Sequence, residues 1–190
     1  MYKKVLVVVA LISCGSIQAR ESKRRPIKEV SVISEEKTAH YNVNMSGVPF
    51  GKEFEASGSC YLHDFKTKKM TIVGDAAIED SIVTYESYIS GELAAHKTTF
   101  GGLVNVSGPV AASMSRFKDK LIADGSVLLI NTTTQDVVVE NHLGQDGQVY
   151  LQGKTTVYGS IVFKSGSGKV YANRSSKIQG TIVGGTLYRQ

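Results

Sequence analysis

Side chains that could perform acid–base chemistry are few in this 190-residue sequence. They fall into two short charged stretches, Asp75, Glu79 and Asp80 in the first and Arg116, Lys118, Asp119 and Lys120 in the second. Two carboxylates at a suitable separation can act as general acid and base on a glycosidic bond. Short charged runs are also typical of solvated turns between strands, and we therefore expect no catalytic site from these residues alone.

Metal-binding and nucleophile motifs are also missing from the sequence. The histidines, His40, His63, His96 and His142, have no Cys or His partner at the spacing of a metal site. There is no G-x-S-x-G motif, no phosphate-binding glycine loop ending in Lys and Ser or Thr, and no EF-hand loop. We expect a protein that is not an enzyme and has no metal, no cofactor and no small-molecule substrate.

The first 19 residues have the pattern of a secretion signal. Lys3 and Lys4 are followed by an apolar run from Val5 to Ile12 and then by small residues. The run is too short for an ordinary membrane-spanning helix. Residues 1–19 are therefore interpreted as a signal peptide.

Two cleavage sites fit this signal. Leu11-Ile-Ser-Cys14 resembles the lipobox of bacterial lipoproteins, whose cysteine becomes the acylated first residue of the mature chain. Ile17-Gln-Ala19 fits an ordinary signal peptidase, which would leave Arg20 first. We favour lipidation of Cys14 by a fatty acid such as palmitate. Gly15, standing where some lipoproteins have Asp, is associated by this resemblance with the outer membrane, and we expect its periplasmic face.

The basic charge of the chain is confined to its start. Residues 1–28 hold seven Lys or Arg and one Glu, a net charge of +6, whereas residues 29–190 hold fifteen against sixteen, a net charge of −1. Residues 20–28 could bind an anionic membrane surface or form a disordered, solvated tether, and the sequence supports both interpretations. No aromatic residues interleave this basic run, so we expect no nucleic acid partner.

A glycine recurs at nearly constant intervals along the rest of the chain. These glycines are 16 or 17 residues apart at first and resume after one longer segment: Gly58, Gly74, Gly91, Gly108 and Gly125, then Gly147 and Gly166. Repeats of about this length are typical of solenoids, in which each repeat buries its apolar face against its neighbours.

Apolar residues fall into columns when the segments are aligned on these glycines. Four residues after each glycine stand Leu62, Ile78, Ala95, Ala112, Leu129, Leu151 and Val170. A second column holds Val83, Phe100, Phe117 and Val157, with Phe65 two places early. Alternation within each run indicates strands with one buried face. We predict an all-β, single-stranded parallel β-helix with about seven rungs of about 17 residues, and a β-sandwich is the alternative.

Cys60 stands in the column of Ala76, Leu93, Val110 and Val127. This position predicts a small buried hydrophobic residue rather than a reactive thiol. With Cys14 lipidated, Cys60 has no cysteine left as a disulfide partner.

The predicted β-helix spans residues 58–190, and residues 29–57 are predicted to form cap strands at its N-terminal end. No helix or proline-rich flap follows the last rung, so we expect the C-terminal end of the coil to be open. One rung is longer than the others by about five residues, which predicts a protruding loop of the kind that often forms binding surfaces. The residues of this loop are Asn141, His142, Gln145 and Asp146.

Glycine-opened rungs with phrases such as Gly159-Ser-Ile-Val and Lys177-Ile-Gln-Gly-Thr-Ile-Val183 resemble the bactofilins. The resemblance covers about residues 58–184 and implies a right-handed coil. Bactofilin units join end to end through their terminal rungs, which implies an assembly interface at Ile178, Ile182, Leu187 and Tyr188. Bactofilins are cytoplasmic, whereas this chain begins with an export signal, so the cytoskeletal role of the family does not transfer directly.

These observations predict a non-enzymatic, lipid-anchored scaffold of the bacterial cell envelope. It would associate with itself or with other envelope proteins through the ends of its coil, as a subunit of a larger complex such as a secretion apparatus. The alternative is a glycan-binding or carbohydrate-active surface protein. Tyrosines gathered on one outer face would favour that alternative, and the candidates are Tyr85, Tyr88, Tyr150, Tyr158 and Tyr171.

Overall fold

In the computed structural model of the protein, residues 36–40, 43–47, 51–140 and 147–190 are described. They lie within one compact unit, Ser34–Gln190. Every regular element of this described part is a β-strand. It accordingly contains no helix of a length and hydropathy that would span a membrane.

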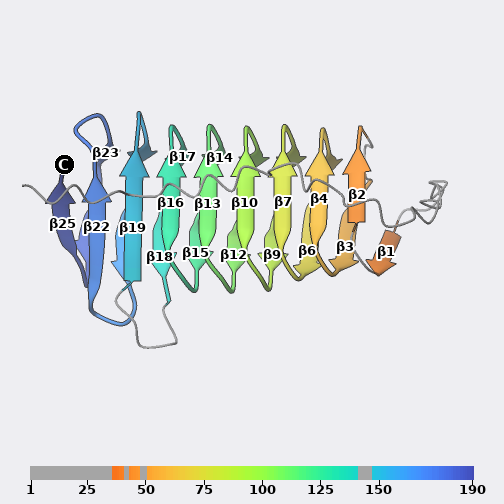
Figure 1. Cartoon of the computed structure of the whole chain (residues 1–190), viewed down its shortest axis with the longest axis horizontal. Coiled ribbons are helices and arrows are strands. Elements are labelled where there is room, and N and C mark those ends of the chain that lie inside the picture. Colours follow the sequence, from red (N-terminus) through yellow and green to blue (C-terminus); the bar gives the residue numbers. More distant parts are fainter. Residues whose placement is uncertain (1–35, 41–42, 48–50, 141–146) are drawn as a thin grey trace, which may run out of the picture. The chain divides into compact units, whose positions relative to one another are not determined.

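The strands form three parallel sheets, which we call A, B and C (Figure 1). Sheet A contains, in spatial order, β1 (Glu36–His40), β3 (Glu53–Ser57), β6 (Lys69–Val73), β9 (Ser87–Ile89), β12 (Val104–Val106), β15 (Leu121–Ala123), β18 (Val137–Val139), β21 (Ile161–Phe163) and β24 (Ile182–Val183). Sheet B contains β2 (Val43–Ser46), β4 (Cys60–His63), β7 (Ala76–Glu79), β10 (Leu93–His96), β13 (Val110–Ser113), β16 (Val127–Ile130), β19 (Gly147–Gln152), β22 (Gly168–Ala172) and β25 (Thr186–Arg189). Sheet C contains β5 (Lys66–Thr67), β8 (Ile82–Val83), β11 (Thr99–Phe100), β14 (Arg116–Phe117), β17 (Thr133–Thr134), β20 (Thr156–Val157) and β23 (Lys177–Ile178).

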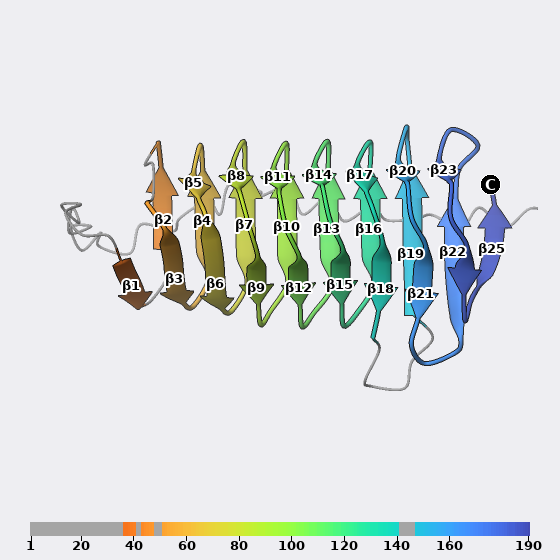
Figure 2. The same cartoon turned by 180° about the vertical axis from the view of Figure 1, so that it is seen from behind.

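Each rung of the coil runs through sheet B, then C, then A, as both cartoon views show (Figures 1 and 2). From β4 to β24 there are seven such rungs, which confirms the predicted parallel β-helix and its repeat. A β-sandwich is excluded because neighbouring strands in all three sheets are parallel. The handedness of the coil stays a prediction. Strands were also expected within residues 29–57, where β1, β2 and β3 occupy the first places of sheets A and B.

The core is the continuous interior of the coil, lined by one face of each strand. The predicted column of Leu62, Ile78, Ala95 and Ala112 is observed, with residues at most 5% exposed. One assignment in this column was wrong. Val170 pairs with Val149, and Ala172 takes the place opposite Leu151, because the longer turn before β22 shifts the count from the preceding glycine. Cys60 is buried in its predicted column, opposite Ala76.

A ladder of buried hydroxyl groups follows the sheet B strands from β7 to β22. Its members are Ser81, Thr98, Ser115, Thr132, Thr155 and Ser176, each at most 4% exposed. In Thr132, for example, Oγ1 accepts a hydrogen bond from the Ser115 amide at 3.3 Å and donates to the Ile130 carbonyl at 3.0 Å. The hydroxyls thus form hydrogen bonds with backbone N–H and C=O groups at the corner, where no neighbouring strand pairs with them. The backbone of the sharp turn into sheet C can therefore be buried without unsatisfied polar groups.

After each sheet B strand from β2 to β19, the next residue turns the corner in a left-handed backbone conformation. Gly47 and Gly153 occupy this position in two rungs, but Asp80, Lys97 and Met114 occupy it in others, with φ between 46° and 50°. A side chain with a Cβ adopts this conformation at a cost of about 1–2 kcal/mol. The repeated corner, rather than residue preference, therefore imposes the conformation at Lys97 and Met114.

Candidate assembly surface at the last rung

The predicted interface residues occupy β23, β24 and β25, the C-terminal strands of the three sheets, and we call these three strands the last rung. Ile178 pairs with Val157, Ile182 with Ile161 and Leu187 with Val170. These partners are all fully buried core residues, so the three side chains continue inward columns of the core. Each is covered by the preceding rung on one side only. Leu187 is 38% exposed, and Ile178 and Ile182 are half-buried against the core.

The backbone of this rung is also paired on one side only. In the described residues β23, β24 and β25 each have a single neighbouring strand, which lies in the preceding rung. Figure 1 shows β25 beside β22 at the end of sheet B. Such edges present N–H and C=O groups that can pair with a further strand. The last rung therefore combines unpaired backbone groups with half-covered apolar side chains.

Arg189 is a feature of this rung that the sequence analysis missed. It pairs with Ala172, a core residue that is 1% exposed, and so stands in an inward column. Its Nη1 donates to the Ser176 carbonyl at 2.9 Å and more weakly to the Asn173 carbonyl at 3.4 Å. The signal was available in the sequence, because Arg189 follows Leu187 by two residues and therefore shares its face of the strand.

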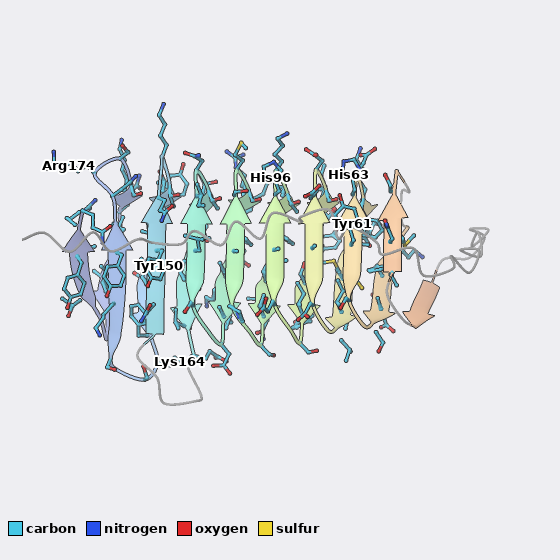
Figure 3. The ribbon with its side chains drawn as sticks, viewed as in Figure 1. Tyr61, His63, His96, Tyr150, Lys164 and Arg174 are labelled. Atoms are coloured by element: carbon cyan, nitrogen blue, oxygen red, sulfur yellow. The ribbon has the colours of Figure 1, made fainter. Side chains whose placement is uncertain are left out.

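Tyr188 lies on the outward face as the last member of a tyrosine ladder. The rings of Tyr150 and Tyr171 stack with centroids 5.0 Å apart, and those of Tyr171 and Tyr188 stack at 5.3 Å. Figure 3 labels Tyr150, from which this ladder runs toward β25. Tyr171 therefore has a ring stacked on each of its two faces, and Tyr150 and Tyr188 each have one face covered by Tyr171.

The tyrosines considered for glycan binding do not gather on one face. Tyr150 and Tyr171 lie on sheet B, Tyr88 lies on β9 of sheet A, and Tyr85 and Tyr158 lie in turns that follow strands of sheet C. The arrangement that would have favoured glycan binding, a set of aromatic faces on one side of the coil, is therefore not present in these five residues.

The carboxylates of the first charged stretch considered for catalysis lie at both ends of β7 and are engaged in other contacts. Asp75 precedes β7 and accepts a hydrogen bond from the Glu92 amide at 2.9 Å. At the other end of β7, Glu79 accepts from the Tyr61 hydroxyl at 2.9 Å, and Asp80 lies 3.7 Å from His63 Nε2. Tyr61 and His63 are both labelled on β4 in Figure 3. These contacts join successive rungs across the outer surface of sheet B.

A shallow groove of about 330 Å³ lies on the outer face of sheet A near β3. Lys69 stands between Glu53 and Glu86, with Nζ–O distances of 4.0 and 3.7 Å, and Tyr88 lines the groove beside them. The three charged residues alternate in sign across neighbouring rungs, so they stabilise one another. Within the described residues there is no group of three or more His, Cys, Asp or Glu side chains placed to hold a metal ion.

Cys60 is the one cysteine of the described residues, and its side chain is buried. Burial raises the pKa of the Cys60 thiol, as expected for a core cysteine. The predicted loop, Asn141, His142, Gln145 and Asp146, falls outside the described residues, and so does Cys14.

Comparison of the chain with protein-family models, with curated proteins and with solved structures gives no match.

Proposed function

We propose that this protein is a non-enzymatic scaffold of the bacterial cell envelope that docks into a larger assembly through the last rung of its coil. The observation that carries the proposal is the exposed end of the core. Ile178, Ile182 and Leu187 continue the fully buried columns of the preceding rung, yet no strand of the described chain covers their second side.

Docking would proceed by strand addition. A segment that pairs with β24 and β25 gains main-chain hydrogen bonds, and its alternate side chains cover the apolar columns. Burying apolar area contributes about 25 cal/mol per Å², so covering three aliphatic side chains adds several kcal/mol to the backbone pairing. The partner would be a second copy of the chain or another envelope protein. The bactofilin-like repeat pattern supports a second copy, and the export signal supports another envelope protein.

The N-terminal region would place the coil at a membrane. In this proposal, lipid on Cys14 anchors the chain to the outer membrane on its periplasmic face, and residues 20–28 link the anchor to the coil. The five Lys and Arg residues of this segment would add attraction to anionic headgroups.

Two neighbouring substitutions test the docking surface with a matched control. Ile182→Lys places a charge in an inward column, whereas Val183→Lys places the same charge on the outward face, where Val183 is already 50% exposed. We expect the Ile182→Lys protein, isolated from envelope fractions, to lose its co-purifying proteins or its own larger species. The Val183→Lys protein should retain them.

Circular dichroism and urea denaturation of both variants check that the coil remains folded. Equal co-purification from the two folded variants would refute docking through the last rung. The Cys14→Ala variant tests the anchor separately, since it should release the protein from the membrane fraction without changing the docking surface.

A further inference from the structure

We propose that the last rung binds an extended segment of a different protein, and that this segment places a carboxylate opposite Arg189 and an aromatic ring opposite Tyr188. The inference rests on the docking function proposed above and specifies the chemistry of the partner. The apolar columns alone would fit either a second copy of the chain or another protein. The positions of Arg189 and Tyr188 favour another protein.

The requirement for a carboxylate follows from the position of Arg189. Arg189 continues the inward column above Ala172, so a strand added to β25 would cover its guanidinium. One nitrogen, Nη1, donates to the carbonyls of Asn173 and Ser176. Among the residues that the structure describes, no carboxylate forms an ion pair with Arg189. A guanidinium has five N–H donors in a planar fork that matches a carboxylate, so an acidic side chain satisfies the charge when water is removed.

A second copy of the chain does not supply that carboxylate. If a second copy continued the coil in register, its β2 would follow β25 in sheet B. The inward columns of β2 and β25 would then join Val43 to Leu187 and Met45 to Arg189. A methionine thioether cannot pair with a guanidinium, and the buried charge would be left without a partner. Inward-pointing charges at sheet edges are a known means of preventing edge-to-edge association.

The requirement for an aromatic ring follows from the tyrosine ladder. Tyr188 stacks on Tyr171 with one ring face, and the next place in that outward column lies over its other face. A ring there continues the stacking that already repeats at 5.0 and 5.3 Å. In a second copy the residue at this place would be Asn44, which has no ring. The outward column that ends at Tyr188 and the inward column that ends at Arg189 therefore both disfavour a second copy of the chain.

A synthetic peptide with the sequence around β22 tests these requirements. Within the chain β22 pairs with β25 so that Tyr171 is opposite Tyr188 and Ala172 is opposite Arg189. The probe is a fluorescent peptide of residues 166–175 carrying Ala172→Glu, and its comparison peptide carries Ala172→Lys. By fluorescence anisotropy with the full-length protein, we expect the Glu peptide to bind at least about tenfold more tightly than the Lys peptide. In the Arg189→Glu protein the preference should reverse.

Further arms separate this inference from the docking function itself. Replacing Tyr171 of the probe by Ala should weaken binding several-fold. Equal binding of the Glu and Lys peptides, with both lost in the Leu187→Lys protein, would overturn the charge requirement and leave docking intact. Binding that is unaffected by Leu187→Lys, at the position opposite Val170 of the probe, would overturn docking through this rung. Light scattering should show one size for the wild-type protein across concentrations, and concentration-dependent growth would overturn the exclusion of a second copy.

Discussion

Removing one hydroxyl of the buried ladder should destabilise the coil although the substitution preserves shape. Thr132→Val replaces Oγ1 by a methyl group at a position with no exposed surface. In the native protein that oxygen accepts from the Ser115 amide at 3.3 Å, and its single O–H is shared between the carbonyls of Ile130 and Ala112, which lie 3.0 and 3.2 Å away. The valine can do neither, so the Ser115 amide is left without this acceptor.

The size of the effect follows from the cost of that unsatisfied donor. A buried N–H without an acceptor costs about 1–3 kcal/mol. The Ile130 carbonyl keeps a second partner, because the Met114 amide also donates to it at 2.9 Å. We therefore expect a loss of about 2 kcal/mol in the free energy of unfolding, which is a large fraction of the usual total of about 5–15 kcal/mol.

Urea denaturation followed by circular dichroism measures this loss, and Thr133→Val is the matched control. Thr133 is the next residue and lies on the outer face, where its hydroxyl makes no hydrogen bond among the described residues. The control should change the free energy of unfolding by less than about 0.5 kcal/mol. If the two variants have the same midpoint, the ladder does not stabilise the corners and this reasoning is wrong.

Three further predictions concern single positions. Gly168→Ala should cost about 1–3 kcal/mol in unfolding free energy, because the added Cβ would lie 2.2 Å from the Phe163 ring. Gly51→Ala, with no atom within 4 Å of the added Cβ, is its neutral control in the same urea titration. Met114→Gly should stabilise the coil by up to about 1 kcal/mol, since Met114 is 52% exposed and has φ of 50°, and a lower midpoint would contradict this. Burial raises the pKa of the Cys60 thiol, so its alkylation should be slow until urea unfolds the chain. Mass spectrometry locates the alkylated residue, and fast labelling of the native protein would refute the burial of Cys60.

The fold was predictable because each rung repeats the same pattern of glycine and apolar residues in the sequence. Recurring glycines and alternating β-branched residues indicated strands at fixed intervals, and the columns beginning at Leu62 and Cys60 were assigned correctly apart from Val170. The corner hydroxyls could have been found in the same way, because Thr98, Ser115 and Thr132 recur at 17-residue intervals. They were missed because a single Ser or Thr at a turn is ordinarily solvated.

The candidate site was predictable in part. Ile178, Ile182 and Leu187 were placed at the end of the coil from the repeat together with the resemblance to bactofilins, and the structure has them in inward columns. Arg189 was missed because a terminal basic residue is ordinarily solvated, and its inward register depends on pairing with Ala172. The stacking of Tyr188 was missed because it depends on the registers of β19, β22 and β25, which the unequal turns between them set.

Site-specific photo-crosslinking in cells tests the central claim most directly. A photoreactive amino acid is placed at Leu187, in the last rung, and in a second strain at Leu128, on the outer face of β16 in the middle of the coil. Docking through the last rung predicts a discrete crosslinked protein from position 187 and none from position 128. The same crosslinked protein from both positions, or from position 128 alone, would contradict the claim.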